Sequence, residues 1–61
     1  MLNTIIHNVI HNEKRMDKLR SAKGDVRDKA KDYVIGEAAA LKVRLTNDEA
    51  IRAAVKIVEA L

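Results

Sequence analysis

The sequence of 61 residues is basic and aliphatic, with 12 Lys and Arg residues against nine Asp and Glu and a net charge of +3. It contains no cysteine, no proline and a single aromatic residue, Tyr33, which excludes disulfide bonds and thiolate metal sites and argues against a β-sandwich or barrel. A chain of this length has room for one domain with a thin core, to which oligomerisation would add stability. We therefore predict a single all-α domain over residues 1–61.

The first predicted helix covers about residues 3–23. It contains no run near the roughly 18 apolar residues that a membrane-spanning helix needs, and its start lacks the features of a signal peptide. We therefore expect a cytoplasmic protein with no transmembrane segment. At about 100° per residue, the apolar residues of this helix fall on one arc: Leu2, Ile5, Ile6, Val9, Ile10, Met16 and Leu19.

Gly24 followed by Asp25 predicts the end of this helix and the N-cap of a second helix over about 26–44. The two helices would then form an antiparallel hairpin. The alternative is one continuous helix in a parallel coiled coil, because a single helical glycine costs only about 1 kcal/mol. We favour the hairpin, since the seam of the coiled coil would have to accept three charged a positions: Lys23, Glu37 and Arg44.

A third helix is predicted over about 47–61. Thr46 as N-cap and Glu49 three residues later form a capping box, which is a strong signal for a helix start. The hairpin and this returning helix together make a small three-helix unit. The predicted apolar stripe of the third helix consists of Ile51, Ala54, Val55, Val58 and Leu61.

The chain carries more aliphatic surface than so thin a core is expected to cover. Residues 34–45 are apolar nearly all round, which predicts a central position, and Gly36 and Ala40 would let another helix come close. We predict that the three-helix unit assembles into a homo-oligomeric helical bundle, most simply a homodimer. The candidate hydrophobic interface consists of Ile5, Ile6, Val9, Ile10, Ile51, Val55, Ile57 and Val58.

His7 and His11 share a helix face and raise the question of a metal site. Zinc proteases place a glutamate base after the first histidine, but Asn8 stands there, and no third ligand is evident. Ser21 is the only serine, and no glycine-rich phosphate loop exists. We predict no enzymatic activity, no catalytic residue, no cofactor and no metal, and we interpret the histidines as flanking a buried stripe. A metal held between copies of the chain is the alternative.

The stretch 14–31, at the tip of the predicted hairpin, holds eight basic and three acidic residues. Such a concentration suits phosphate binding, although the acids interrupt it. Aliphatic helix faces are more abundant and suit helix-on-helix docking. The predicted function is therefore a non-enzymatic interaction protein that self-associates and regulates, inhibits or bridges a larger protein partner. The alternative is a nucleic-acid-binding regulator that uses the basic tip: Lys14, Arg15, Lys18, Arg20, Lys23, Arg27, Lys29 and Lys31.

Overall fold

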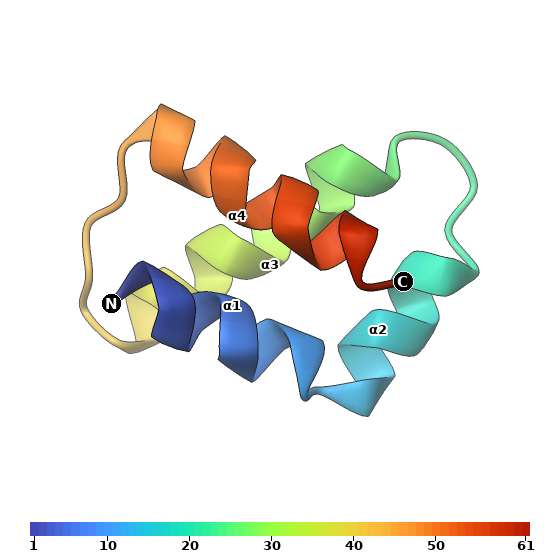
Figure 1. Ribbon diagram of the computed structural model, residues 1–61, viewed down its shortest axis with the longest axis horizontal. Coiled ribbons are helices and arrows are strands. Elements are labelled where there is room, and N and C mark those ends of the chain that lie inside the picture. The colour runs from blue at the N-terminus through green and yellow to red at the C-terminus, as the bar shows by residue number, and fades with distance from the viewer.

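The structure, a computed structural model that describes residues 1–61, consists of helices joined by short loops (Figure 1). The all-α prediction is confirmed, but the predicted number of three helices is wrong, because the first of them is divided. No helix has both the length and the apolar character needed to cross a membrane. The four helices are α1 (Leu2–Ile10), α2 (Glu13–Arg20), α3 (Val26–Ala40) and α4 (Asn47–Glu59).

The first predicted helix, 3–23, is interrupted at Asn12. The backbone of Asn12 is extended, and its side-chain oxygen accepts a hydrogen bond from the backbone N–H of Arg15 at 3.1 Å. Asn12 is therefore the N-cap of α2, and Glu13 adds a negative charge in the first turn, where the helix dipole favours it. The prediction missed this start because the apolar arc continues across it to Met16, which is buried like the core residues of α1.

The chain turns at Gly24, as the hairpin interpretation requires. Gly24 has a φ of 103°, a left-handed conformation that glycine adopts without a steric penalty. Asp25 then caps α3, accepting hydrogen bonds from the backbone N–H groups of Arg27 at 3.0 Å and Asp28 at 3.3 Å. The break at Gly24 is thus confirmed and the continuous helix is excluded. α2 ends somewhat earlier than predicted, at Arg20.

The second predicted helix, 26–44, also ends early. Lys42 has a φ of 57°, and its N–H donates to the carbonyl oxygen of Ala39 at 3.1 Å. The N–H of Val43 donates to the carbonyl oxygen of Ala38 at 2.8 Å. These two bonds form a Schellman motif, the common way in which the last carbonyl groups of a helix are satisfied. The sequence carried no signal for it, because a lysine occupies the left-handed position where glycine is usual.

α4 begins where the capping box predicted. The hydroxyl oxygen of Thr46 accepts a hydrogen bond from the backbone N–H of Glu49 at 3.2 Å, and the Glu49 carboxylate accepts one from the backbone N–H of Thr46 at 3.0 Å. The second of these bonds is the main reason why the pKa of Glu49 lies below its ordinary value. The predicted start is confirmed, and the helix ends at Glu59 instead of continuing to residue 61.

The core lies between all four helices. α3 packs against each of the other three, and α1 also packs against α4 (Figure 1). The larger core side chains come mostly from α1 and α2, whereas α3 and α4 contribute mainly alanine. Small side chains at a contact let helix axes approach more closely. The core consists of Ile5, Ile6, Val9, Met16, Leu19, Ala30, Val34, Ala38, Ala50, Ala53, Ala54 and Ile57.

The core accommodates more aliphatic residues than expected. Four members of the candidate hydrophobic interface are buried within the chain itself: Ile5, Ile6, Val9 and Ile57. Ile10 and Val58 are half-buried and pack against this core. Gly36 and Ala40, expected to admit a neighbouring helix, are instead exposed, and a Cβ on Gly36 would meet nothing within 4 Å. α3 occupies the expected central position, and its inward side consists of Ala30, Val34 and Ala38.

Candidate interaction surfaces

α4 buries a different face from the one predicted. Its inward side consists of Ala50, Ala53, Ala54 and Ile57. Of the predicted stripe, Ile51 is 37% exposed, and Val55 is half-buried without packing against the core. Ala54 is the one member of the stripe inside the core, Val58 packs partly against the core, and Leu61 is 40% exposed. The helix thus turns three alanines and Ile57 inward and leaves Ile51 exposed, with Val55 and Val58 half-buried. We call Ile51, Val55 and Val58 the α4 strip.

Opposite charges flank the α4 strip. At about 100° per residue, Ile51 and Val58 lie on one side of Val55, and Arg52 and Glu59 lie on the other, within roughly 60° of it. Arg52 and Glu59 are both exposed, and neither takes part in an ion pair. They were not singled out in the sequence. The sequence feature that could have identified them is a pair of opposite charges, seven residues apart, beside an aliphatic stripe.

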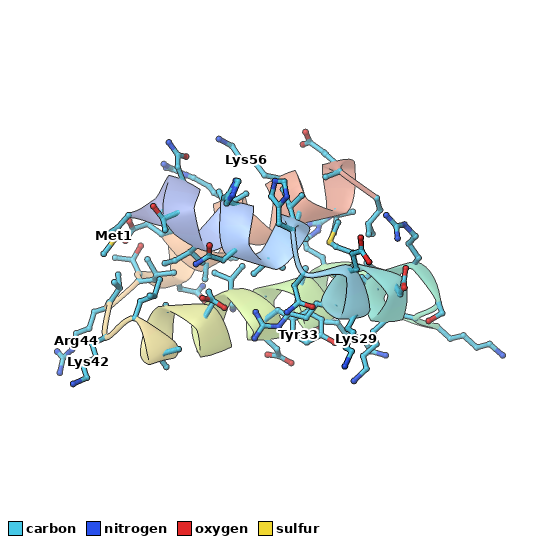
Figure 2. All side chains as sticks on the ribbon, turned by 90° about the horizontal axis from the view of Figure 1, so that it is seen from below. Met1, Lys29, Tyr33, Lys42, Arg44 and Lys56 are labelled. Carbon is cyan, nitrogen blue, oxygen red and sulfur yellow. The ribbon has the colours of Figure 1, made fainter.

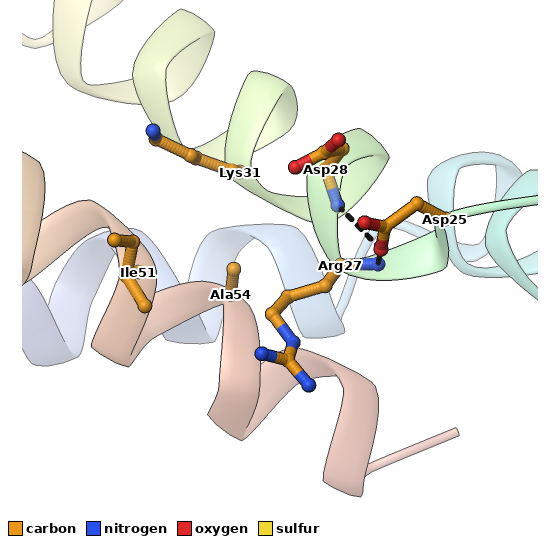
Figure 3. Close-up of a pocket in the computed structure, with 6 residues that line it drawn as sticks. All are labelled: Asp25, Arg27, Asp28, Lys31, Ile51 and Ala54. Atoms are coloured by element: carbon orange, nitrogen blue, oxygen red, sulfur yellow. Dashed lines mark hydrogen bonds between the residues drawn. The ribbon is translucent and has the colours of Figure 1, made fainter.

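Beside the α4 strip lies a pocket of about 210 Å³ between the start of α3 and α4 (Figure 3). It is smaller than the roughly 300 Å³ at which small-molecule sites usually begin. The Asp25 carboxylate is already used as the α3 N-cap. Lys31 donates a hydrogen bond to the side-chain oxygen of Asn47 at 2.6 Å, tying α3 to the start of α4. The pocket is lined by Asp25, Arg27, Asp28, Lys31, Ile51 and Ala54.

Arg15 belongs to a structural network between helices. Its guanidinium donates to Glu37 at 2.8 Å, and Asn8 donates to the other oxygen of the same carboxylate at 3.1 Å. These two hydrogen bonds hold the pKa of Glu37 below its ordinary value, and the bond from Arg15 has the larger effect. The Arg15 guanidinium also lies 5.6 Å from the centre of the Tyr33 ring. The network joins α1 and α2 to α3 and leaves Arg15 little freedom to bind an external anion.

The remaining basic residues of stretch 14–31 fall into three groups. Arg20 pairs with Asp17 at 2.9 Å, and Lys31 bonds to Asn47 as described. Arg27 lines the pocket toward α4 (Figure 3). The other four are exposed and have neither an ion pair nor a side-chain hydrogen bond. These four residues are Lys14, Lys18, Lys23 and Lys29, and we call them the α2–α3 basic face.

The Arg15–Tyr33 contact sets the register between α2 and α3. Lys18 lies one turn after Arg15, and Lys29 lies one turn before Tyr33, so both come one turn closer to the connecting loop. Figure 2 shows Lys29 and Tyr33 on the same side of the molecule, with Lys56 on the opposite side and Lys42 at the far end of α3. The eight predicted basic residues therefore do not all face the same way; of the four free lysines, Lys14 and Lys18 lie on α2, Lys29 lies on α3, and Lys23 lies in the loop that connects the two helices.

His7 and His11 lie where the sequence placed them, on one exposed side of α1 and its C-cap. Their ring centres are 4.0 Å apart and the rings are tilted by 35°. No group of three or more His, Cys, Asp or Glu side chains comes together as a metal-binding set. The pair therefore remains two neighbouring imidazoles at the surface.

Comparison with protein-family models, curated proteins and solved structures gives no match to this chain.

Proposed function

We propose that this chain is a small, non-enzymatic interaction protein that acts as a homodimer joined through the α4 strip. In this proposal the dimer is the unit that regulates, inhibits or bridges a larger protein partner. The observation that carries it is the orientation of α4, whose alanines face the core while Ile51 and Val55 remain outside it. Covering aliphatic surface contributes about 25 cal/mol per Å², and the monomer leaves this contribution unused.

The residues around the α4 strip complement a second copy of themselves. In a twofold symmetric pair, each contact between two different residues occurs twice. With two α4 helices antiparallel and the axis at Val55, Ile51 comes beside Val58 of the second copy. Arg52 comes beside Glu59 of the second copy on the charged side. Arg52 precedes Val55 by three residues and Glu59 follows it by four, so their levels differ by about 1.5 Å, the rise of one residue.

The central experiment is a charge exchange, read out as molecular mass by sedimentation equilibrium. We expect the wild-type chain to reach twice its 6.8 kDa at high concentration. Arg52→Glu and Glu59→Arg should each weaken the dimer about 10-fold, because two attractive pairs become two repulsive ones. Combining them should restore the dimer. Arg44→Glu, the same charge reversal at an exposed position outside α4, is the matched control.

A second pair of variants tests the aliphatic part of the strip. Ile51 and Leu41 are almost equally exposed, at 37% and 38%. Ile51→Asn should therefore abolish the dimer, while Leu41→Asn, which lies outside the strip, should leave it intact. Far-UV circular dichroism checks that both variants are folded. A wild-type chain that stays monomeric at millimolar concentration would refute the homodimer. Dimers indifferent to both Arg52→Glu and Ile51→Asn would refute this interface.

A further inference from the structure

We propose that the α2–α3 basic face binds the phosphate backbone of a double-stranded nucleic acid. This face consists of the four lysines without partners: Lys14, Lys18, Lys23 and Lys29. The inference does not depend on the homodimer, because α4 contributes none of these residues. It narrows the basic stretch 14–31 to the free lysines, since Arg27, which also has no ion pair or side-chain hydrogen bond, lines the pocket toward α4 instead.

The first argument concerns which cations are available. Arg15, Arg20 and Lys31 already bind groups within the chain, at 2.8 Å, 2.9 Å and 2.6 Å respectively. Each of these three cations is already attracted to an acceptor within the chain, and for Arg15 and Arg20 that acceptor is a carboxylate, which weakens their attraction for an external phosphate. The free lysines have no such internal acceptor. Lys14 and Lys18 lie one turn apart on the exposed side of α2, and Lys18 and Lys29 stand at one level across α2 and α3.

The second argument concerns the acids of the same stretch. Asp17 is paired with Arg20, and Asp25 accepts the hydrogen bonds that cap α3. Asp28 lines the pocket between the start of α3 and α4 (Figure 3). Of the three acids that interrupt the sequence, one is thus paired with an arginine, one faces the start of α3, where the helix dipole attracts negative charge, and one lines the pocket. Asp32, exposed on α3 and unpaired, is the acid that remains near Lys29 along this helix.

The third argument favours a duplex over a single strand. Proteins that bind single strands without sequence preference stack the bases on aromatic side chains. Tyr33 is the only aromatic residue among Phe, Trp and Tyr, it is half-buried against the core, and the Arg15 guanidinium lies over its ring. A duplex needs no stacking partner, because its phosphates can be bound by lysines alone.

The experiment is fluorescence anisotropy with a fluorescein-labelled DNA duplex of mixed sequence, using the full chain. Four lysine–phosphate contacts predict a slope of about −3.6 in a plot of log affinity against log salt, so raising the salt from about 50 to about 200 mM should weaken binding about 100-fold. The test variant is Lys18→Gln with Lys29→Gln. The matched control, Lys42→Gln with Lys56→Gln, removes the same charge from exposed positions far from Lys29 (Figure 2).

We expect the test variant to bind the duplex about 10-fold more weakly and to lower the salt slope by about two, with the control within threefold of wild type. Asp32→Asn should strengthen binding slightly. Equal losses in both double variants would overturn the proposal, because they would show attraction to net charge alone. So would the absence of duplex binding at low salt, or tighter binding of the corresponding single strand. Binding to phosphatidylserine vesicles without duplex binding would also overturn it.

Discussion

The two halves of this chain contribute to the core in different ways. α1 and α2 supply bulky side chains and bury nearly all of them, including Ile5, Val9 and Leu19. α3 and α4 supply mainly alanine to the same core and keep Ile35, which is 49% exposed, and Ile51 at the surface. On a helix with small residues inward and large aliphatic residues outward, one face packs in the core and another face is available for contact with a partner.

This contrast separates the aliphatic residues that stabilise the monomer from those that are available to a partner. In the first half nearly every aliphatic residue has a partner within the chain, so changes there should act on stability. In the second half Ile51 and Val55 do not pack against the core of their own chain, so changes at these two positions should affect association between chains. The Glu37 network connects the halves, because Asn8 and Arg15 of the first half both donate to a carboxylate of the second.

The largest expected effect comes from truncating one isoleucine in each half. Ile5→Ala should lower the free energy of unfolding by about 2–4 kcal/mol, since Ile5 is fully buried and its loss leaves a cavity. Ile51→Ala should change it by less than about 0.5 kcal/mol in the monomer. Urea denaturation at low protein concentration measures both. Similar losses for the two variants would contradict the division between the halves.

An intermediate effect is expected from enlarging an alanine. Ala53 is fully buried in α4, and Ala53→Leu should destabilise the chain by about 1–3 kcal/mol, because a packed interior has no room for the added methyl groups. Ala39→Leu places the same side chain at an exposed position of α3 and should be nearly neutral. Thermal unfolding of the two variants compares them directly. A neutral Ala53→Leu would show that α4 does not rely on close alanine packing.

The smallest effect concerns the bond between the halves. The pKa of Glu37 is lowered in the folded chain by hydrogen bonds from Arg15 and Asn8, so its contribution is present above the ordinary pKa of about 4.5 and is lost as the pH falls through the lower, folded value. Glu37→Gln should cost about 0.5–1 kcal/mol at neutral pH. It should also flatten the stability curve below about pH 4.5. Urea titrations across this range measure the difference, with Asp32→Asn, at an exposed and unpaired carboxylate of α3, as the control.

Most of the helix starts were open to prediction because their causes are local. Thr46 and Glu49, or Asp25 and the N–H groups after it, lie within one turn of each other and need no tertiary contact to form their hydrogen bonds. Asn12 is also a local N-cap signal. The prediction missed it because the apolar residues before and after it continue one helical pattern. The end of α3 had no such local sequence signal, because Lys42 takes the left-handed conformation there, where glycine is usual.

The candidate surfaces were predicted less completely. Ile51, Val55 and Val58 were named as interface residues and lie partly exposed, and their role in dimerisation stays a prediction. The eight basic residues were treated alike, yet three of them bond within the chain. The Arg15–Glu37 bond joins residues 22 positions apart, and no local pattern distinguishes that arginine from Arg20 or Arg27. Separating bound from free cations required the spatial arrangement of the helices.

The sequence by itself determined an all-helical chain with a turn at Gly24 and a capped final helix, because backbone propensity and capping act between near neighbours. Only the tertiary structure decided which face of α4 is buried. Its aliphatic and alanine faces are adjacent and both apolar, so hydrophobicity does not choose between them. The choice follows from packing, since α4 must fit against both α1 and α3, and alanine allows the closer approach.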